Sequence, residues 1–153
     1  MLNLTSTAIL RPWHKLLNLP RQSPPSWYHD RLREELIERE EAGTPLEKLS
    51  ETADVFFAIS RATYDGYPVR EMPRFRYSHV PVYAYMLAKY TSRWAFYRAF
   101  AFLCDAPDCR AVREVVNPTK DHKLDQVSER DNINSDKFRR LGRWLRRVWP
   151  LFP

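Results

Sequence analysis

A short turn between two long helical segments is the feature that most constrains how this 153-residue chain can fold. Residues Thr44-Pro45-Leu46-Glu47 supply a capping threonine, a proline at the first helical position and a glutamate three residues after the cap. This capping box predicts a helix that begins directly after the threonine. It should continue to about Tyr64, where Asp65-Gly66 ends it. Apolar residues recur along it at helical spacing and form its expected core face, namely Leu46, Leu49, Ala53, Phe56 and Ile59.

The segment before this turn is the second predicted helix. Ser26 can cap it, and it should run to about Ala42, where Gly43 supplies the C-terminal stop. Helices joined by so short a turn pack side by side in opposite directions. We therefore expect an antiparallel helix pair over residues 26–64.

Glycine and proline usage extends the helical prediction to the rest of the chain. Only three glycines occur, few runs alternate as strands do, and the twelve prolines are mostly bunched, which predicts an all-α fold, a compact helical bundle. Residues 1–25 are predicted to be an irregular arm that packs on the body through Trp13, Leu16, Leu17 and Leu19, and residues 26–153 a single helical domain. The further helices are expected at about 81–104, 110–116, 120–130 and 136–148, the last capped by Ser135.

Charge and cysteine content narrow the class of protein. The formal net charge is +6, which suits an anionic ligand such as a nucleotide or diphosphate. Cys104 and Cys109, the two cysteines, match no zinc signature and are too few for a secreted disulfide scaffold, so we expect reduced thiols in a cytoplasmic protein. The N-terminus lacks the basic region of a signal peptide, and we expect no transmembrane segment.

Two pairs of acidic residues carry the clearest chemical signal. Glu35 and Glu38 are three residues apart on the first helix of the pair, and Glu51 and Asp54 have the same spacing on the second. Residues three apart are neighbours on a helix surface, so each pair can aim at one point. In an antiparallel pair the four carboxylates can converge, and a hard divalent cation such as Mg²⁺ relieves their repulsion. The alternative is a solvated face on which basic neighbours pair with these acids, namely Arg31, Arg33, Arg39 and Lys48.

The acidic pattern resembles a known family. Glu34-Glu35-xx-Glu38, twelve residues and then Glu51-xx-Asp54 is similar to the motif of the all-α, MazG-like nucleoside triphosphate pyrophosphohydrolases. The Val55-Phe56-Phe57 run and a tryptophan ahead of the first acidic helix also match, and the likeness covers about residues 26–64. It implies Mg²⁺, or Mn²⁺ as a substitute, held by Glu35, Glu38, Glu51 and Asp54. It also implies cleavage between the α and β phosphates to give a monophosphate and pyrophosphate, with Glu34 a weaker catalytic candidate that positions water.

Basic and polar groups are expected to neutralise the phosphates of such a substrate. The candidate phosphate-binding residues are Arg61, Lys89, Arg93, Asn117 and Lys120, although solvated lysines are the default for the last. The partner would be a nucleotide or another small diphosphate compound, with no nucleic acid polymer. The family resemblance also suggests a homo-oligomer, a dimer or tetramer.

Two other functions remain open at this point. The helix expected at about 81–104 is rich in aromatic residues, and an aromatic-lined pocket beside Mg²⁺-diphosphate is also typical of terpene-type cyclases. Aromatics at helical spacing more often form core. The acids can also be a plain surface of a non-catalytic binding module. The last helix is basic and amphipathic; we expect its apolar face (Phe138, Leu141, Leu145, Val148 and Trp149) to dock on the bundle, rather than to bind a membrane or partner.

Overall fold

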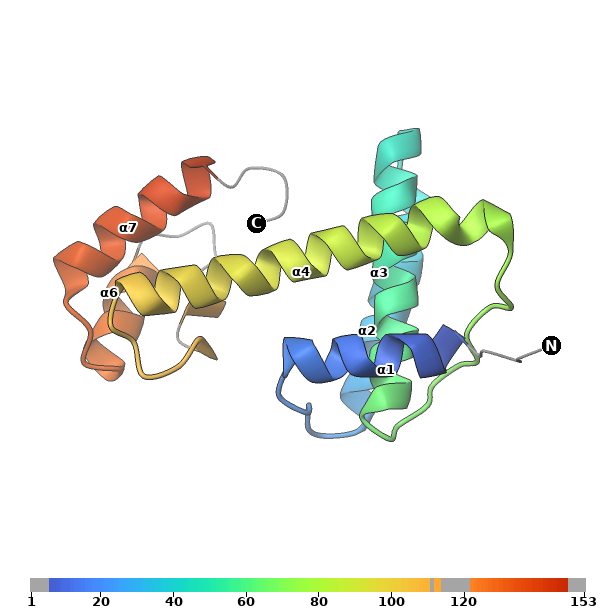
Figure 1. Ribbon diagram of the computed structural model, residues 1–153, viewed down its shortest axis with the longest axis horizontal. Coiled ribbons are helices and arrows are strands. Elements are labelled where there is room, and N and C mark those ends of the chain that lie inside the picture. Colours follow the sequence, from blue (N-terminus) through green and yellow to red (C-terminus); the bar gives the residue numbers. More distant parts are fainter. Residues whose placement is uncertain (1–5, 111, 114–121, 149–153) are drawn as a thin grey trace. The chain divides into compact units, whose positions relative to one another are not determined.

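The computed structural model describes residues 6–110, 112–113 and 122–148, and in these residues all regular secondary structure is helical (Figure 1). The predicted all-α class is thereby confirmed. The helix predicted at 110–116 lies largely outside the described residues. No helix of the described part is long and apolar enough to cross a membrane. The elements are α1 (Ser6–Leu17), α2 (Ser26–Glu41), α3 (Pro45–Tyr64), the 3-10 turn η1 (Tyr77–His79), α4 (Val80–Leu103), α6 (His122–Arg130) and α7 (Ser135–Val148).

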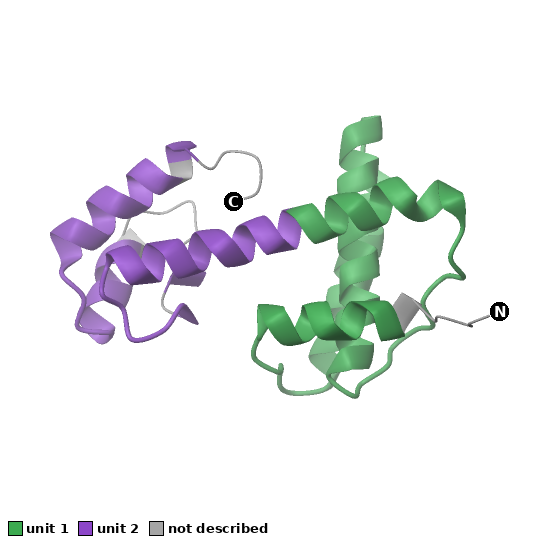
Figure 2. Cartoon of the chain, in the orientation of Figure 1, with its two compact units in different colours: residues 1–88 green, residues 89–153 purple. Residues whose placement is uncertain are grey.

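The chain divides into two compact units, Met1–Ala88 and Lys89–Pro153, which Figure 2 shows in different colours. The boundary falls within α4. Both acidic pairs belong to the first unit, together with α1, α2 and α3. The second unit contains α6, α7 and the basic C-terminal region.

The start of α3 has the predicted capping box. Thr44 has extended backbone angles, and its hydroxyl accepts a hydrogen bond from the backbone N–H of Glu47 at 3.2 Å. The Glu47 carboxylate accepts in return from the backbone N–H groups of Thr44 at 2.9 Å and Gly43 at 3.0 Å. These bonds hold the pKa of Glu47 below its ordinary value. The cap therefore fixes both the turn and the direction in which α3 leaves it.

Replacing Thr44 with alanine is expected to destabilise the protein by about 1 kcal/mol, because the Glu47 N–H loses its acceptor. Urea unfolding should show a lower midpoint with an unchanged slope. Thr44→Ser, which keeps the hydroxyl, is the matched control and should unfold like the wild type. An alanine variant as stable as the serine variant would contradict this role of the cap.

α2 and α3 pack side by side and run in opposite directions, as predicted (Figure 1). Near the start of α2, the Tyr28 hydroxyl donates a 2.6 Å hydrogen bond to the carboxylate of Asp65, just after the end of α3. Further along α2, Glu35 and Glu38 lie beside Glu51 in the first half of α3. This direction brings the acidic residues of both helices together, as the spacing requires.

The buried face of α3 agrees with the predicted one except at its first residue. Ala53, Phe56 and Ile59 are buried, and Leu49 is half-buried. Leu46 is 65% exposed, so its assignment to the core was wrong. Leu46 belongs to the first turn of α3, at the end of the helix pair, where the described residues leave most of it exposed.

Residues 6–17 of the N-terminal arm form the helix α1, which corrects the prediction of an irregular segment. Leu10, His14 and Leu17 lie on one face of α1 and are buried against α3. Pro12 lies inside the helix, where it removes one backbone donor, and this was the signal against a helix. Packing of the buried face on α3 outweighs that loss, because most helical stability in proteins comes from tertiary contacts.

The first residue of α2 also differs from the prediction, because Ser26 does not cap this helix. Pro25 at the N-cap already has helical backbone angles, φ −55° and ψ −28°, and no side chain caps the helix. The first turn is closed by the N–H of Trp27, which donates to the Pro24 carbonyl at 3.0 Å. Ser26 therefore lies inside the first turn, where its side chain is not placed to cap.

The second unit has a core of its own, built on the aromatic residues of α4. Phe100 stacks on Phe138 of α7 with ring centroids 4.9 Å apart, and Phe96 is buried beside it. A Cβ atom at Gly142 would lie 3.0 Å from Phe100, so α7 approaches closely because this residue has no side chain. The apolar face of α7 therefore docks as predicted through Phe138 and Leu145. The predicted face fails at Val148, which is 51% exposed at the end of α7, and Trp149 lies outside the described residues.

Candidate metal centre

Three carboxylates from two helices converge at one point of the first unit. Glu35, Glu38 and Glu51 each offer an oxygen, and these three atoms lie within 4.8 Å of one another. Opposite ligands of an octahedral Mg²⁺ lie about 4.2 Å apart, twice its bond length to oxygen. The three oxygens are thus close to the spacing that one divalent cation requires.

Glu35 is the most deeply buried of the three acids. It is 1% exposed, and its Oε2 atom is buried without a hydrogen-bond partner. Burial raises the pKa of Glu35 to about 7, the Arg31 guanidinium opposes this shift, and the charges of Asp54, Glu38 and Glu51 add to it. An unpaired carboxylate oxygen in the interior is costly unless a cation or a donor reaches it.

The other two acids of the motif take different positions. Asp54 is buried, and its charge acts on Glu35, but it is not one of the three residues whose oxygens converge. Its role as a ligand stays a prediction. Glu34 points to the outside, where its side chain is 55% exposed and pairs with Arg31 at 2.5 Å. The structure therefore brings together three of the four predicted ligands and leaves Glu34 at the edge.

Arg31 supplies the positive charge at this site. Its guanidinium forms ion pairs with Glu34 and with the Oε1 atom of Glu35, as the alternative interpretation of the acids anticipated. One arginine does not balance Glu35, Glu38 and Glu51, which carry three negative charges when ionised. A divalent cation beside Arg31 would bring the total close to neutral.

One side of the site is open to solvent. Glu38 is exposed, and it lines a hollow of about 390 Å³ on the outer face of α2 together with Glu34, Ile37 and Glu41. Mg²⁺ in proteins usually keeps several waters or substrate phosphates in its coordination shell. A cation held by Glu35 and Glu38 would therefore have protein ligands on one side and solvent on the other.

Arg61 does not direct its guanidinium to the acids, although it was predicted to bind phosphate. It is buried and forms an ion pair with Asp65 at 2.7 Å. It also donates a 2.7 Å hydrogen bond to the Leu19 carbonyl. These contacts hold the side chain at the C-terminal turn of α3, and the acids lie in the first half of that helix. Its predicted role at the site gains no support from this position.

A buried polar network, which the sequence did not reveal, surrounds Arg61. His14 of α1 shares a 3.0 Å hydrogen bond with the Ser60 hydroxyl, and Tyr28 donates to Asp65. Tyr28 is buried, and its hydroxyl is engaged here. The four-residue spacing of Arg61 and Asp65 was the one local signal, and the remaining contacts join residues far apart in sequence.

The position of His14 makes part of the stability depend on pH. Burial and the charge of Arg61 lower the pKa of His14 to about 4, while Asp65 acts in the opposite direction. The unfolded chain binds a proton at His14 near the ordinary pKa of about 6.5, so acid favours unfolding between these values. The contribution of His14 is complete above pH 6.5 and is lost as the pH falls toward 4.

We expect His14→Gln to lose this pH dependence. The unfolding free energy of the wild type relative to His14→Gln should fall by about 3 kcal/mol between pH 7 and pH 4. The pKa of Glu35 is shifted upward, so Glu35 changes the unfolding free energy with pH in the opposite sense. It does so equally in both proteins, and taking the difference between them removes its effect. Parallel pH profiles of the two proteins from urea unfolding would show that His14 does not titrate in this way.

The remaining predicted phosphate-binding residues belong to the second unit. Lys89 is buried, and Arg93 lies over the Tyr90 ring, 5.4 Å from its centroid. Asn117 and Lys120 lie outside the described residues. All four stay predictions.

Comparison of the chain with protein-family models, with curated proteins and with solved structures found no match. The function is therefore inferred from the geometry of the site and from the motif in the sequence.

Proposed function

We propose that this chain is a Mg²⁺-dependent nucleoside triphosphate pyrophosphohydrolase. The observation that carries the proposal is the convergence of Glu35, Glu38 and Glu51, together with the buried Oε2 atom of Glu35 that has no hydrogen-bond partner. The antiparallel helix pair and the similarity of the acidic spacing to the MazG-like motif support it. The net charge of +6 suits an anionic substrate.

In this proposal the carboxylates hold the cation and leave part of its shell to substrate and water. A bound Mg²⁺ would polarise the phosphoryl group under attack and lower the pKa of a bound water. Glu35 supplies the buried anchor, Glu38 and Glu51 complete the ligand set, and Asp54 adds negative charge one turn further along α3. Arg31 keeps Glu34 and Glu35 in place through its ion pairs.

Three further predictions from the sequence belong to the same proposal. They are Mn²⁺ as a substitute, a dimer or tetramer, and a cytoplasmic location. The isoprenoid alternative gains no specific support, because Phe96 and Phe100 of the aromatic helix pack in a core rather than line a described hollow. The nucleotide assay described next distinguishes the non-catalytic alternative from the proposed hydrolase.

The test is a panel of nucleoside triphosphates incubated with the purified protein and Mg²⁺. We expect at least one nucleotide to yield its monophosphate together with pyrophosphate, and EDTA to stop the reaction. Diphosphate with inorganic phosphate as products, or no turnover of any nucleotide, would contradict the proposal. Farnesyl diphosphate is included in the panel, and a cyclised hydrocarbon from it would favour the isoprenoid alternative instead.

A further inference from the structure

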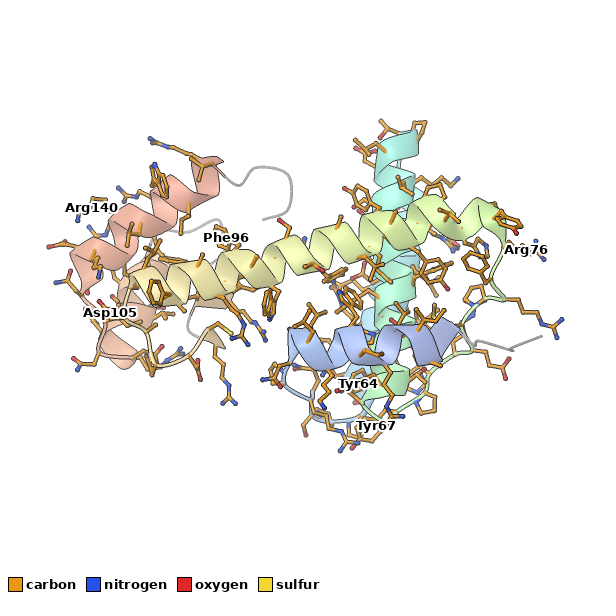
Figure 3. All side chains as sticks on the ribbon, viewed as in Figure 1. Tyr64, Tyr67, Arg76, Phe96, Asp105 and Arg140 are labelled. Atoms are coloured by element: carbon orange, nitrogen blue, oxygen red, sulfur yellow. The ribbon has the colours of Figure 1, made fainter. Side chains whose placement is uncertain are left out.

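A second charged site lies in the first unit, at the end of α3 remote from the acids. An open hollow of about 820 Å³ is lined by Arg11 and Lys15 of α1, by Arg21, and by the segment Tyr64–Gly66. Tyr64, which lines this hollow, and Tyr67 are both labelled in Figure 3. The size is within the range of pockets that bind small molecules.

The charge of the hollow is positive. Arg11, Lys15 and Arg21 are all exposed, and within the described part of the chain Arg11 and Lys15 have no ion-pair partner. Asp65 is the one acid among the described residues that line the hollow. Its carboxylate is already engaged by the Arg61 guanidinium and the Tyr28 hydroxyl. Three cationic groups therefore face the hollow, and the described residues of its wall offer no free counter-charge.

Arg21 is held in place before any ligand binds. Its guanidinium lies over the Tyr67 ring, 4.5 Å from the centroid, and donates a hydrogen bond to the Asp65 carbonyl. Gly66 permits this approach, since a Cβ atom there would lie 3.2 Å from Arg21. Gly66 also has a φ of +86°, which a residue with a side chain rarely adopts. A fixed guanidinium offers its remaining N–H groups to a ligand at little entropic cost.

Arg11 and Lys15 complete the arrangement from α1. They are four residues apart and therefore neighbours on one face of the helix, where like charges repel. A bound anion would relieve this repulsion. Phosphate groups suit the set because arginine binds them through paired hydrogen bonds and lysine binds them as a point charge.

The hollow is separate from the acidic site. Asp54 and Tyr64 are ten residues apart on α3, which corresponds to about 15 Å along the helix. Glu51 lies one turn further away. The phosphates of one small molecule bound to a cation at Glu35 do not extend over this distance, so the two sites would hold different molecules.

We propose that the hollow formed by Arg11, Lys15 and Arg21 is a binding site for a small phosphorylated compound that carries at least two negative charges. The site needs no metal ion. The inference stands on this hollow alone and does not depend on the hydrolase activity proposed for the acids. The competing explanation is that these cations only compensate the negative end of α3.

Pyrophosphate is the probe, and isothermal titration calorimetry in EDTA at low salt is the measurement. EDTA removes any cation from the acids. We expect the wild type and Glu35→Gln to bind pyrophosphate equally. The double variant Arg11→Gln/Lys15→Gln should bind at least about tenfold more weakly, because two charge-assisted contacts are lost.

The matched control is Arg74→Gln/Arg76→Gln, which removes the same charge from another exposed segment. Arg76 lies well apart from Tyr64 and Tyr67 in Figure 3. The affinity of this control variant for pyrophosphate should stay within twofold of that of the wild type. No binding by the wild type, or an equal loss in both double variants, would overturn the site. So would binding to phosphatidylglycerol vesicles without binding to free pyrophosphate, since the surface would then recognise lipid head groups.

Discussion

Glu35→Gln is expected to lower Mg²⁺-dependent pyrophosphate release by at least about 100-fold, because the buried ligand is lost. Even the mutation of a residue that only hydrogen-bonds to a metal ligand typically lowers metal affinity or activity by about 10- to 100-fold. At the same time the metal-free protein should become more stable at pH 8, by about 1–2 kcal/mol. The reason is that the burial of this carboxylate, and its repulsion by the neighbouring acids, outweigh the Arg31 ion pair.

The opposite signs of these two effects distinguish a functional carboxylate from a structural one. Glu40→Gln is the matched control, since Glu40 is an exposed acid on the same helix. It should leave both turnover and stability close to those of the wild type. If Glu35→Gln retains turnover, or destabilises the metal-free protein, Glu35 does not have the role that the geometry assigns to it.

Arg61→Met is expected to destabilise the protein by about 3–5 kcal/mol, the usual cost of removing one partner of a buried ion pair. The change leaves the Asp65 carboxylate without its guanidinium partner and removes the hydrogen bond to Leu19. Urea unfolding measures the loss. Arg61→Met/Asp65→Asn, which also removes the orphaned charge, should recover part of it.

This experiment also decides between the two roles considered for Arg61. Arg33→Met removes an exposed arginine of α2 and should change stability by no more than about 0.5 kcal/mol. If Arg61 has a structural role, Arg61→Met should lose much more stability than Arg33→Met. If Arg61→Met is as stable as Arg33→Met but raises KM for a nucleotide, Arg61 binds phosphate after all.

The features that were predictable from sequence are those determined by short-range chemistry. The start of α3 follows from hydrogen bonds among Thr44, Glu47 and their neighbours, all within four residues. The convergence of Glu35, Glu38 and Glu51 follows from helix periodicity and the short turn. These signals depend little on the rest of the chain.

The features that were not predictable depend on contacts between distant segments. Pro12 argues locally against α1, and only the packing of Leu10 and Leu17 on α3 explains why a helix forms there. The burial of Arg61 depends on Leu19, 42 residues away in sequence. The basic hollow likewise forms only because α1 packs near the end of α3, and no sequence motif predicts that contact.

A Mn²⁺ titration followed by electron paramagnetic resonance measures directly whether the three converging carboxylates hold a divalent cation. Bound Mn²⁺ loses the sharp signal of the free ion, so the bound fraction can be measured. We expect saturable binding by the wild type and Glu40→Gln, and loss of binding by Glu35→Gln and Glu51→Gln. No binding by the wild type at millimolar Mn²⁺, or equal binding by all four proteins, would contradict it.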